Sequence, residues 1–246
     1  MGSTGGCASD DMRGLEIATT PVPGSADVPV KAWREFWMPR YREKLEQARR
    51  EGGAVRVVLL GDSNTHFWET NGKTVYDEVL APYHALNLAA SGDRVQHWLW
   101  IVGENEPWDR IRPGLVVVTI GTNNLTHDDL TSPAAVAEAV RRGLAELRRK
   151  LPETAIVLCG VPPGGKTPDH PHRAPLRDLD RRLAAFADPD HEIFFIDLYD
   201  RMLKPDGTLS DAMLPDSVHL AGPGYRIWAE LLQPYLEKYA RQPCGK

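Results

Sequence analysis

The sequence lacks several features that would place it in a large class of proteins. None of its 246 residues belongs to an apolar stretch of eighteen or more, so no membrane-spanning helix is predicted. Acidic residues outnumber basic ones by 34 to 29, and the net charge of −5 provides no positive field to attract nucleic acid. We therefore expect a soluble chain, either cytoplasmic or exported with its leader removed.

Cysteine is scarce as well. Cys7, Cys159 and Cys244 form an odd, widely separated set without a CxxC pair, which argues against a disulfide framework or a zinc site. Cys159 ends an apolar run and is predicted to be a buried core thiol. His170 and His172 flank a proline without a clear third ligand, so neither a metal nor a cofactor is predicted.

The first 28 residues are rich in glycine, serine, threonine, aspartate and proline, and are predicted to form a flexible or extended N-terminal arm. Within this arm, residues 5–9 (GGCAS) have two open interpretations, a processed lipoprotein site or a loose tail left by cloning. Residues 29–246 contain no internal repeat or linker and suit a single domain.

Five short apolar runs bounded by turn residues are predicted to be β-strands. Their continuous hydrophobicity indicates burial on both faces, as in a parallel sheet. Helical periodicity alternates with them, which predicts a three-layer α/β/α sandwich around a five-stranded parallel sheet. The expected strands are residues 55–60, 84–89, 115–120, 155–160 and 193–198, and the expected helices are residues 30–51, 94–102, 133–150, 174–187 and 223–239. Such folds bind ligands at the carboxyl ends of the strands.

A serine follows the first predicted strand, in the sequence GDSNT at residues 61–65. At a strand-to-helix turn, Ser63 can present its hydroxyl to a cleft and its N–H to a developing oxyanion. A serine needs a base to become a nucleophile, and the late sequence DSVH offers one: His219 can accept the proton while Asp216 orients the imidazole. Taken separately, Ser63 could simply cap a helix, and Asp216 and His219 could be a surface pair.

Two more predicted strands are followed by hydrogen-bond donors. Gly92, in the sequence ASGD, would let the backbone approach a bound atom closely. Asn123 and Asn124, in the sequence GTNN, supply a neutral amide that could stabilise an oxyanion. Each segment alone could be an ordinary turn. Together with Ser63 and His219, however, they supply the parts that acyl transfer requires.

The GDSN, ASGD, GTNN and DSVH segments resemble the four sequence blocks of the SGNH (GDSL-like) hydrolase family, over residues 55–236. The resemblance is closest to the branch that contains the brain-type platelet-activating-factor acetylhydrolase catalytic subunits. It implies a flavodoxin-like sheet and a metal-free serine esterase, with Ser63 as nucleophile, His219 as general base and then acid, and Asp216 as its orienting partner.

The resemblance also implies an oxyanion hole made of the Ser63 N–H, the Gly92 N–H and the Asn123 side chain. This sequence departs from the family at Ser91, which stands where a glycine is usual, and at Ala89 nearby. Because the oxyanion donor at Gly92 is a backbone N–H, these changes should alter the shape of the pocket more than the chemistry.

In the same branch, the residues after the serine and before the histidine border a small acyl pocket, and here these are Asn64 and Val218. They favour a short acyl group, chiefly acetyl, on a carbohydrate or another small alcohol. A lysophospholipase or lipase of the same family is the alternative. Trp68, Trp98 and Trp100 could stack on a sugar or could be core or rim aromatics. Association into a homo-oligomer is left open, since some members of the branch associate.

One further motif points to a different class of protein. Residues 160–167 (GVPPGGKT) match the P-loop pattern of nucleotide-binding proteins and follow a predicted strand. A P-loop holds phosphates with backbone N–H groups, and neither Pro162 nor Pro163 has one. The prolines at 168 and 171 also disfavour a helix directly after the motif. A P-loop NTPase is therefore the less favoured alternative, and a GxSxG elbow is absent from the sequence.

Overall fold

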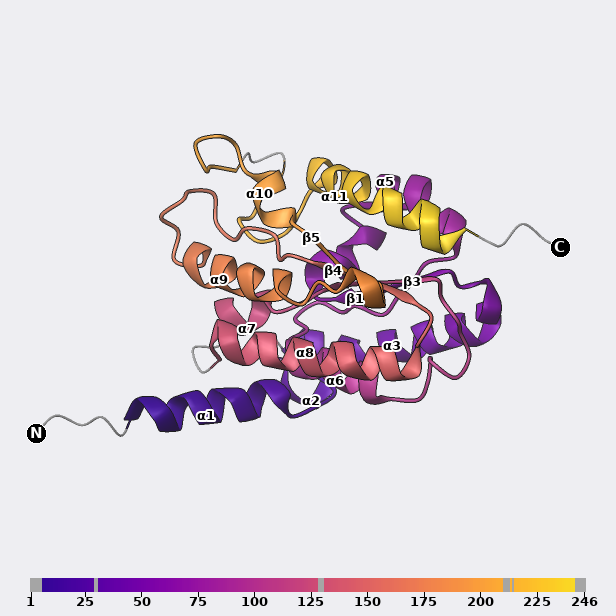
Figure 1. Cartoon of the computed structure of the whole chain (residues 1–246), viewed down its shortest axis with the longest axis horizontal. Helices are drawn as coiled ribbons and strands as arrows, with labels where there is room; N and C mark the ends of the chain where they lie inside the picture. The colour runs from indigo at the N-terminus through magenta and orange to yellow at the C-terminus, as the bar shows by residue number, and fades with distance from the viewer. Residues whose placement is uncertain (1–5, 29–30, 128–130, 210–212, 214, 242–246) are drawn as a thin grey trace, which may run out of the picture.

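The computed structural model describes residues 6–28, 31–127, 131–209, 213 and 215–241. Five parallel strands form one sheet in the order β2-β1-β3-β4-β5. Helices cover both faces, so the predicted three-layer sandwich with a five-stranded parallel sheet is confirmed (Figure 1). The strands are β1 (Val57–Gly61), β2 (Leu86–Asn87), β3 (Leu115–Thr119), β4 (Ala155–Cys159) and β5 (Ile193–Ile196).

Alternation along the strands divides the core into two halves. Val58 and Leu60 of β1 pack beneath one helical layer, while Val57 and Leu59 pack beneath the other. The first layer contains α1 (Gly6–Thr19), α3 (Lys31–Glu51), α6 (Val95–Gly103), α8 (Pro133–Lys150) and α9 (Arg173–Ala184). The second contains α5 (Lys73–Val79), α10 (Leu198–Met202) and α11 (Gly222–Tyr235). All four of these β1 side chains are fully buried, which explains why the strand reads as an unbroken apolar run.

Short elements complete the chain. They are α2 (Gly24–Asp27), α4 (Ser63–His66), α7 (Thr122–Thr126), the 3₁₀ turns η1 (Gly52–Ala54), η2 (Phe67–Glu69), η3 (Ala81–Tyr83) and η4 (Pro189–His191), and the π turn η5 (Leu236–Ala240). The predicted last helix therefore ends in a π turn.

The second strand is shorter than the sequence predicts. His84 has a left-handed backbone (φ 49°) at the end of η3, so β2 begins only at Leu86. Asn87 then ends the strand, because its side-chain oxygen accepts a hydrogen bond from the Ala89 N–H at 3.1 Å. Arg40 donates to the carbonyl oxygens of Asn87 and Ala89 at 3.2 and 2.7 Å, and so takes the place of a neighbouring strand on this edge.

The N-terminal segment differs from the expected extended arm. Residues 6–19 form α1, which packs on α8 and α6, and Ala18 is fully buried there. The segment from Met12 to Ala18 contains good helix formers, and Leu15 contacts the core. The prediction of an extended arm is therefore wrong for α1. The division of the chain at residue 28 stays a prediction, and so do the two interpretations of residues 5–9, whose side chains lie outside the described ones.

The strand order places the site. The connections leave β1 and β3 in opposite directions, to β2 on one side and β4 on the other, which is the switch point where flavodoxin-like sheets bind ligands. The α7 and α10 helices, which follow β3 and β5, mark the carboxyl edge at the left of Figure 1. Ser63 follows β1 at this edge and Asn123 follows β3.

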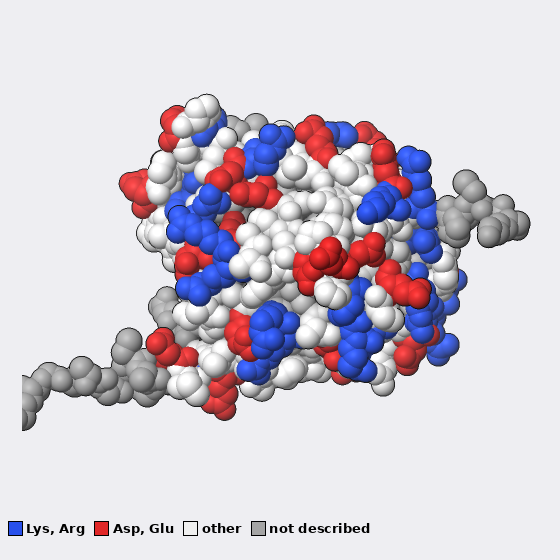
Figure 2. Space-filling model, viewed as in Figure 1, with Lys and Arg blue, Asp and Glu red and all other residues white. Residues whose placement is uncertain are grey.

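The surface carries mixed charge. On the face shown in Figure 2, acidic and basic side chains are interspersed around an uncharged area, without a large patch of either sign. Among the described residues, no helix is both long enough and apolar enough to cross a membrane.

Candidate active site

Ser63 is the first residue of α4 and is only 6% exposed. The preceding Asp62 is extended, and its carboxylate accepts a hydrogen bond from the Asn64 N–H at 3.0 Å. This cap turns the chain sharply from β1 into α4. Burial raises the pKa of Asp62 to about 6, against the hydrogen bond from Asn64, which favours the ionised form.

The chain brings His219 to this serine from 156 residues away. His219 Nε2 lies 2.9 Å from Ser63 Oγ, and His219 Nδ1 lies 2.7 Å from Asp216 Oδ2. Burial opposes the charge on Asp216, but hydrogen bonds from His219 and Val218 prevail and hold its pKa below the usual value. An ionised Asp216 can only accept, so the imidazole proton sits on Nδ1 and the lone pair of Nε2 faces the serine.

Asn64 joins the two halves of the site. Its Nδ2 donates to the Val218 carbonyl at 3.2 Å, and its Oδ1 accepts from the Leu220 N–H at 3.0 Å. Its own carbonyl accepts from the Tyr225 hydroxyl at 2.8 Å. The side chain is almost fully buried, so its amide holds the histidine loop against α4 on either side of His219. Direct contact of Asn64 and Val218 with substrate stays a prediction.

The P-loop-like segment supports the same histidine loop. Ser217 has a left-handed backbone (φ 69°), which is uncommon for serine, and its carbonyl accepts a hydrogen bond from the Gly165 N–H at 2.9 Å. The first regular helix after residues 160–167 is α9, which begins at Arg173. An N–H that a P-loop would direct at phosphate is thus bonded within the protein, and no helix follows directly. The structure argues against the nucleotide-binding alternative.

Gly92 lies in a tight turn after β2, and its N–H as an oxyanion donor stays a prediction. The Asp93 N–H donates to the Ala90 carbonyl at 3.2 Å, and Gly92 has a φ of +85°, as the third position of a type II turn requires. A Cβ at Gly92 would lie 2.6 Å from Val28 Cγ1 and 2.8 Å from Trp33 Cε3. Glycine is therefore needed twice over, for the backbone angle and for the close packing of Val28 and Trp33.

Asp93 holds this turn and Asn123 together, which the sequence analysis did not predict. Its carboxylate accepts from Trp37 Nε1 at 2.6 Å and from the Ala90 N–H at 3.2 Å, and its backbone carbonyl accepts from Asn123 Nδ2 at 2.8 Å. His97 Nδ1 lies 3.5 Å away. Burial raises the pKa of Asp93, against the hydrogen bonds from its partners. The only signal in the sequence was an acidic residue directly after the expected oxyanion glycine.

Two of the three tryptophans considered for sugar binding are core residues, and Trp100 is partly buried against the core. Trp68 and Trp98 are almost fully buried. Trp68 packs against Tyr225, with ring centroids 4.7 Å apart. Trp100 packs edge-on against Trp37, at 5.5 Å. The alternative of sugar stacking is therefore wrong for Trp68 and Trp98, while for Trp100 it stays a prediction. Cys159, by contrast, is the buried thiol that was predicted, and burial raises its pKa to about 12.

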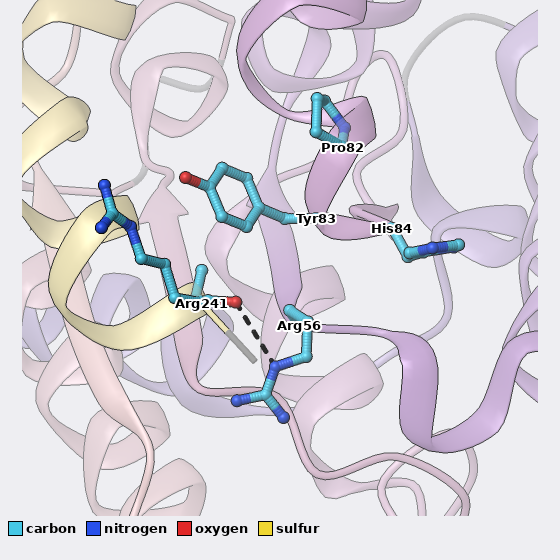
Figure 3. A pocket seen from close by; sticks show the side chains of 6 residues that line it. Arg56, Pro82, Tyr83, His84 and Arg241 are labelled. Atoms are coloured by element: carbon cyan, nitrogen blue, oxygen red, sulfur yellow. Dashed lines mark hydrogen bonds between the residues drawn. The ribbon is translucent and has the colours of Figure 1, made fainter. Parts of the chain in front are cut away.

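A separate cavity of about 360 Å³ lies at the opposite edge of the sheet. Arg56, just before β1, and Tyr83, His84 and Arg241 line it, and Arg56 donates to the carbonyl of residue 240 at 3.4 Å (Figure 3). Because Ser63 follows the other end of β1, this cavity is not part of the candidate active site.

Comparisons with known proteins find similar sequences and similar folds. The model of the GDSL-like Lipase/Acylhydrolase family matches residues 59–227. Platelet-activating factor acetylhydrolase IB subunit alpha1 of Rattus norvegicus is 32% identical over 194 residues, which cover 77% of this chain and 78% of that protein. The alpha2 subunit of the same species is 27% identical, over 74% of each chain.

Solved structures share the fold. A GDSL-like lipase from Bacteroides thetaiotaomicron superposes with a TM-score of 0.66 and 20% identity, covering 81% of this chain and 97% of its own. An acetylxylan esterase from Geobacillus stearothermophilus superposes with a TM-score of 0.58 and 16% identity, covering 78% and 98%. At these identities the likeness extends to the fold alone.

Proposed function

Since the chain belongs to the GDSL-like lipase/acylhydrolase family and is an ester hydrolase, we propose that it is a serine esterase for short-chain O-esters, chiefly acetyl esters. The observation that carries the proposal is the chain of contacts from Asp216 through His219 to Ser63, at 2.7 and 2.9 Å. This is the arrangement in which a serine hydroxyl loses its proton to an imidazole as it attacks.

The reaction begins when Ser63 Oγ attacks the ester carbonyl while His219 Nε2 takes its proton. The N–H groups of Ser63 and Gly92 and the Asn123 amide stabilise the negative oxygen that forms. His219 then gives the proton to the departing alcohol, which leaves an acyl group on Ser63. Water, deprotonated by His219, releases the acid and restores the serine. Asp216 holds the imidazole in the required tautomer throughout.

The preference for acetyl rests on two considerations. The names of two relatives, a platelet-activating factor acetylhydrolase and an acetylxylan esterase, both specify removal of acetyl groups. In addition, Asn64 directly follows the serine, and its buried amide is fixed at both ends by Val218 and Leu220. A rigid, polar border of this kind suits a short acyl chain better than a long one. A lipase of the same family is the second candidate, and it predicts faster cleavage of long-chain esters.

The test is hydrolysis of p-nitrophenyl esters from acetate to decanoate by wild type and by Ser63→Ala. We expect the highest kcat/KM for acetate and a loss of at least about 10⁴-fold in the variant. A fluorophosphonate probe should label the wild type and not Ser63→Ala, because only an activated serine is phosphonylated.

Ser132→Ala is the matched control. Ser132 caps α8 through a hydrogen bond from the Ala135 N–H at 3.2 Å and has no part in the proposed reaction. This variant should lose about 1 kcal/mol of stability and keep both activity and labelling. Full activity in a folded Ser63→Ala variant would refute the proposed nucleophile, and a maximum at long chains would favour the lipase.

A further inference from the structure

A line of aromatic rings leads from the surface to the proposed catalytic histidine. Phe36 stacks on His66, with ring centroids 5.6 Å apart and planes 13° apart. His66 contacts Phe67 at 5.4 Å, and Phe67 contacts His219 at 5.0 Å. We call Phe36, His66 and Phe67 the aromatic strip. It combines the first half of α3 with α4 and η2, which are far apart in the sequence.

The outer end of the strip is exposed. Phe36 is 41% accessible to solvent, and in the part of the chain that the structure describes, only Met12 is another large hydrophobic side chain classed as exposed. A single exposed apolar residue is ordinary in itself. Phe36 differs from Met12 because its ring continues, through two more rings, to the imidazole that would act on the substrate.

The chemistry of the proposed reaction decides what this strip would contact. The departing alcohol takes its proton from His219 Nε2, so the alcohol oxygen must come within hydrogen-bond distance of that atom. Phe67 lies against the same imidazole. The part of the ester beyond the alcohol oxygen therefore has the strip as its neighbour, while the acyl part lies on the other side of the carbonyl carbon.

The strip is apolar on its ring faces and polar at one point. His66 Nδ1 lies 3.0 Å from the Ser91 hydroxyl. Burial, with the nearby Arg40 and Lys44, lowers the pKa of His66 to about 4, so the ring is neutral near pH 7. The charges of Arg40 and Lys44 are directed at Glu69, at 2.9 and 2.7 Å. The strip thus offers flat apolar faces beside a neutral imidazole and hydroxyl that are bonded to each other, of which the hydroxyl oxygen can still accept a hydrogen bond.

We propose that the aromatic strip binds the alcohol part of the ester, and that this alcohol is a sugar ring. A pyranose has a face of C–H groups that packs against aromatic rings and a rim of hydroxyls that hydrogen-bond to neutral polar groups, and the strip offers both. A fatty alcohol would make no use of the hydrogen-bonded His66–Ser91 pair, whose hydroxyl oxygen can accept a further hydrogen bond, and a charged head group would find no opposite charge on the strip. The inference rests on the proposed esterase function and names the substrate class for it.

The test compares two acetates that differ only in the alcohol: a mono-acetylated methyl xylopyranoside and ethyl acetate, whose alcohol is too small to reach Phe36. For Phe36→Ala we expect the ratio of their kcat/KM values, sugar ester over ethyl acetate, to fall about 5- to 10-fold, mainly through KM. Phe36→Tyr should keep the ratio because it keeps the ring, and Phe36→Leu should lower it. Met12→Ala, the other exposed hydrophobic residue, should leave the ratio unchanged.

Three results would overturn the inference. The first is an unchanged ratio in Phe36→Ala, and the second is a full ratio in Phe36→Leu, which would make the surface merely apolar. The third is that Phe36→Ala lowers kcat/KM for cyclohexyl acetate as much as it lowers kcat/KM for the sugar ester. Cyclohexyl acetate has a six-membered ring like that of a sugar but no hydroxyls. If the wild type cleaves ethyl acetate but not the sugar ester, the inference fails while the esterase stands. If the wild type cleaves neither, the proposed function itself has failed.

Discussion

The turn that contains the proposed oxyanion donor Gly92 is held by Asp93, which has no exposed surface, whereas His219 is held by Asp216, whose side chain is 56% exposed. Asp93 joins three segments: its own turn, the Trp37 indole of α3 and the Asn123 amide of α7. Among the described residues, Asp216 bonds within its own loop, to Val218 and His219.

The difference separates two kinds of carboxylate. The buried carboxylate contributes to folding and to the placement of the proposed oxyanion donor at Gly92 at the same time, because removing it leaves the buried N–H groups of Trp37 and Ala90 without partners. The exposed one can be replaced at little cost to folding, because water can take over its hydrogen bonds. Loss of activity and loss of stability should therefore go together on the oxyanion side and separately on the histidine side.

The largest effect is expected for Asp216→Asn. The amide oxygen of this variant accepts from the backbone N–H groups of Val218 and His219, so its NH₂ faces His219 Nδ1. The imidazole proton then moves to Nε2, which can no longer accept the serine proton, and kcat should fall on the order of 10³- to 10⁴-fold. The free energy of unfolding should change by less than about 0.5 kcal/mol. Steady-state kinetics and urea denaturation give the two quantities.

Asp206→Asn is the matched control for this variant. Asp206 is also an exposed loop aspartate that accepts from the N–H two residues ahead, at 2.9 Å from Thr208. It should change neither activity nor stability appreciably. If kcat of Asp216→Asn falls by less than tenfold, the exposed carboxylate is dispensable for activity. The proposed difference between Asp93 and Asp216 would then be wrong for Asp216.

Asp93→Asn should affect both properties. One acceptor oxygen becomes a donor, so either the Trp37 N–H or the Ala90 N–H loses its partner, and the folded state should lose about 3 kcal/mol. The turn at Gly92 then relaxes, and kcat should fall about 10- to 100-fold. Urea denaturation and kcat, measured on the same preparation, check whether the two losses appear together.

Asp180→Asn tests whether any buried carboxyl group would do the same. Asp180 is buried and accepts from the Val161 N–H at 2.8 Å, and burial raises its pKa well above the usual value, so an amide replaces it closely. Its variant should keep kcat. If Asp93→Asn loses stability but keeps kcat, the buried Asp93 carboxylate contributes to folding and not to catalysis.

The smallest effect concerns Asp62 and pH. The pKa of this buried carboxyl is about 6 in the folded protein and about 3.8 when unfolded, so the folded state binds its proton more tightly. Its contribution to stability is fully present below pH 3.8 and is lost as pH rises through 6, amounting to about 3 kcal/mol at most. Asp62→Asn cannot ionise, so its stability should gain on the wild type from pH 4 to pH 8. Parallel curves of unfolding free energy against pH would contradict this.

Much of the fold could be predicted because it depends on local pattern. All five strands were located within a few residues, since continuous apolar runs such as 115–120 and 155–160 have few other interpretations. The helix α1 was missed because a helical stretch around Leu15 is short and surrounded by small and polar residues. Its stability comes from packing on α8, which the local sequence does not show.

The site was predicted as a set of residues but not as a network. Ser63, Gly92 and Asn123 could be located because each follows a strand that ends at the same edge of the sheet. The role of Asn64 as a link to the histidine loop could not, because its partners lie 154 and 156 residues away. The bond between Trp37 and Asp93 was hidden for the same reason: it depends on tertiary packing across 56 residues.

The distance along the chain between sheet and base has a consequence during synthesis. The sheet is complete at Ile196, but His219 and the Leu220 N–H that Asn64 binds come later. By the proposed mechanism, a nascent chain whose five strands are already paired is still chemically inert while the segment with His219 remains inside the ribosome. Hydrolysis becomes available only when the last segment of the polypeptide closes over the serine, so the appearance of activity reports the end of folding and not its beginning.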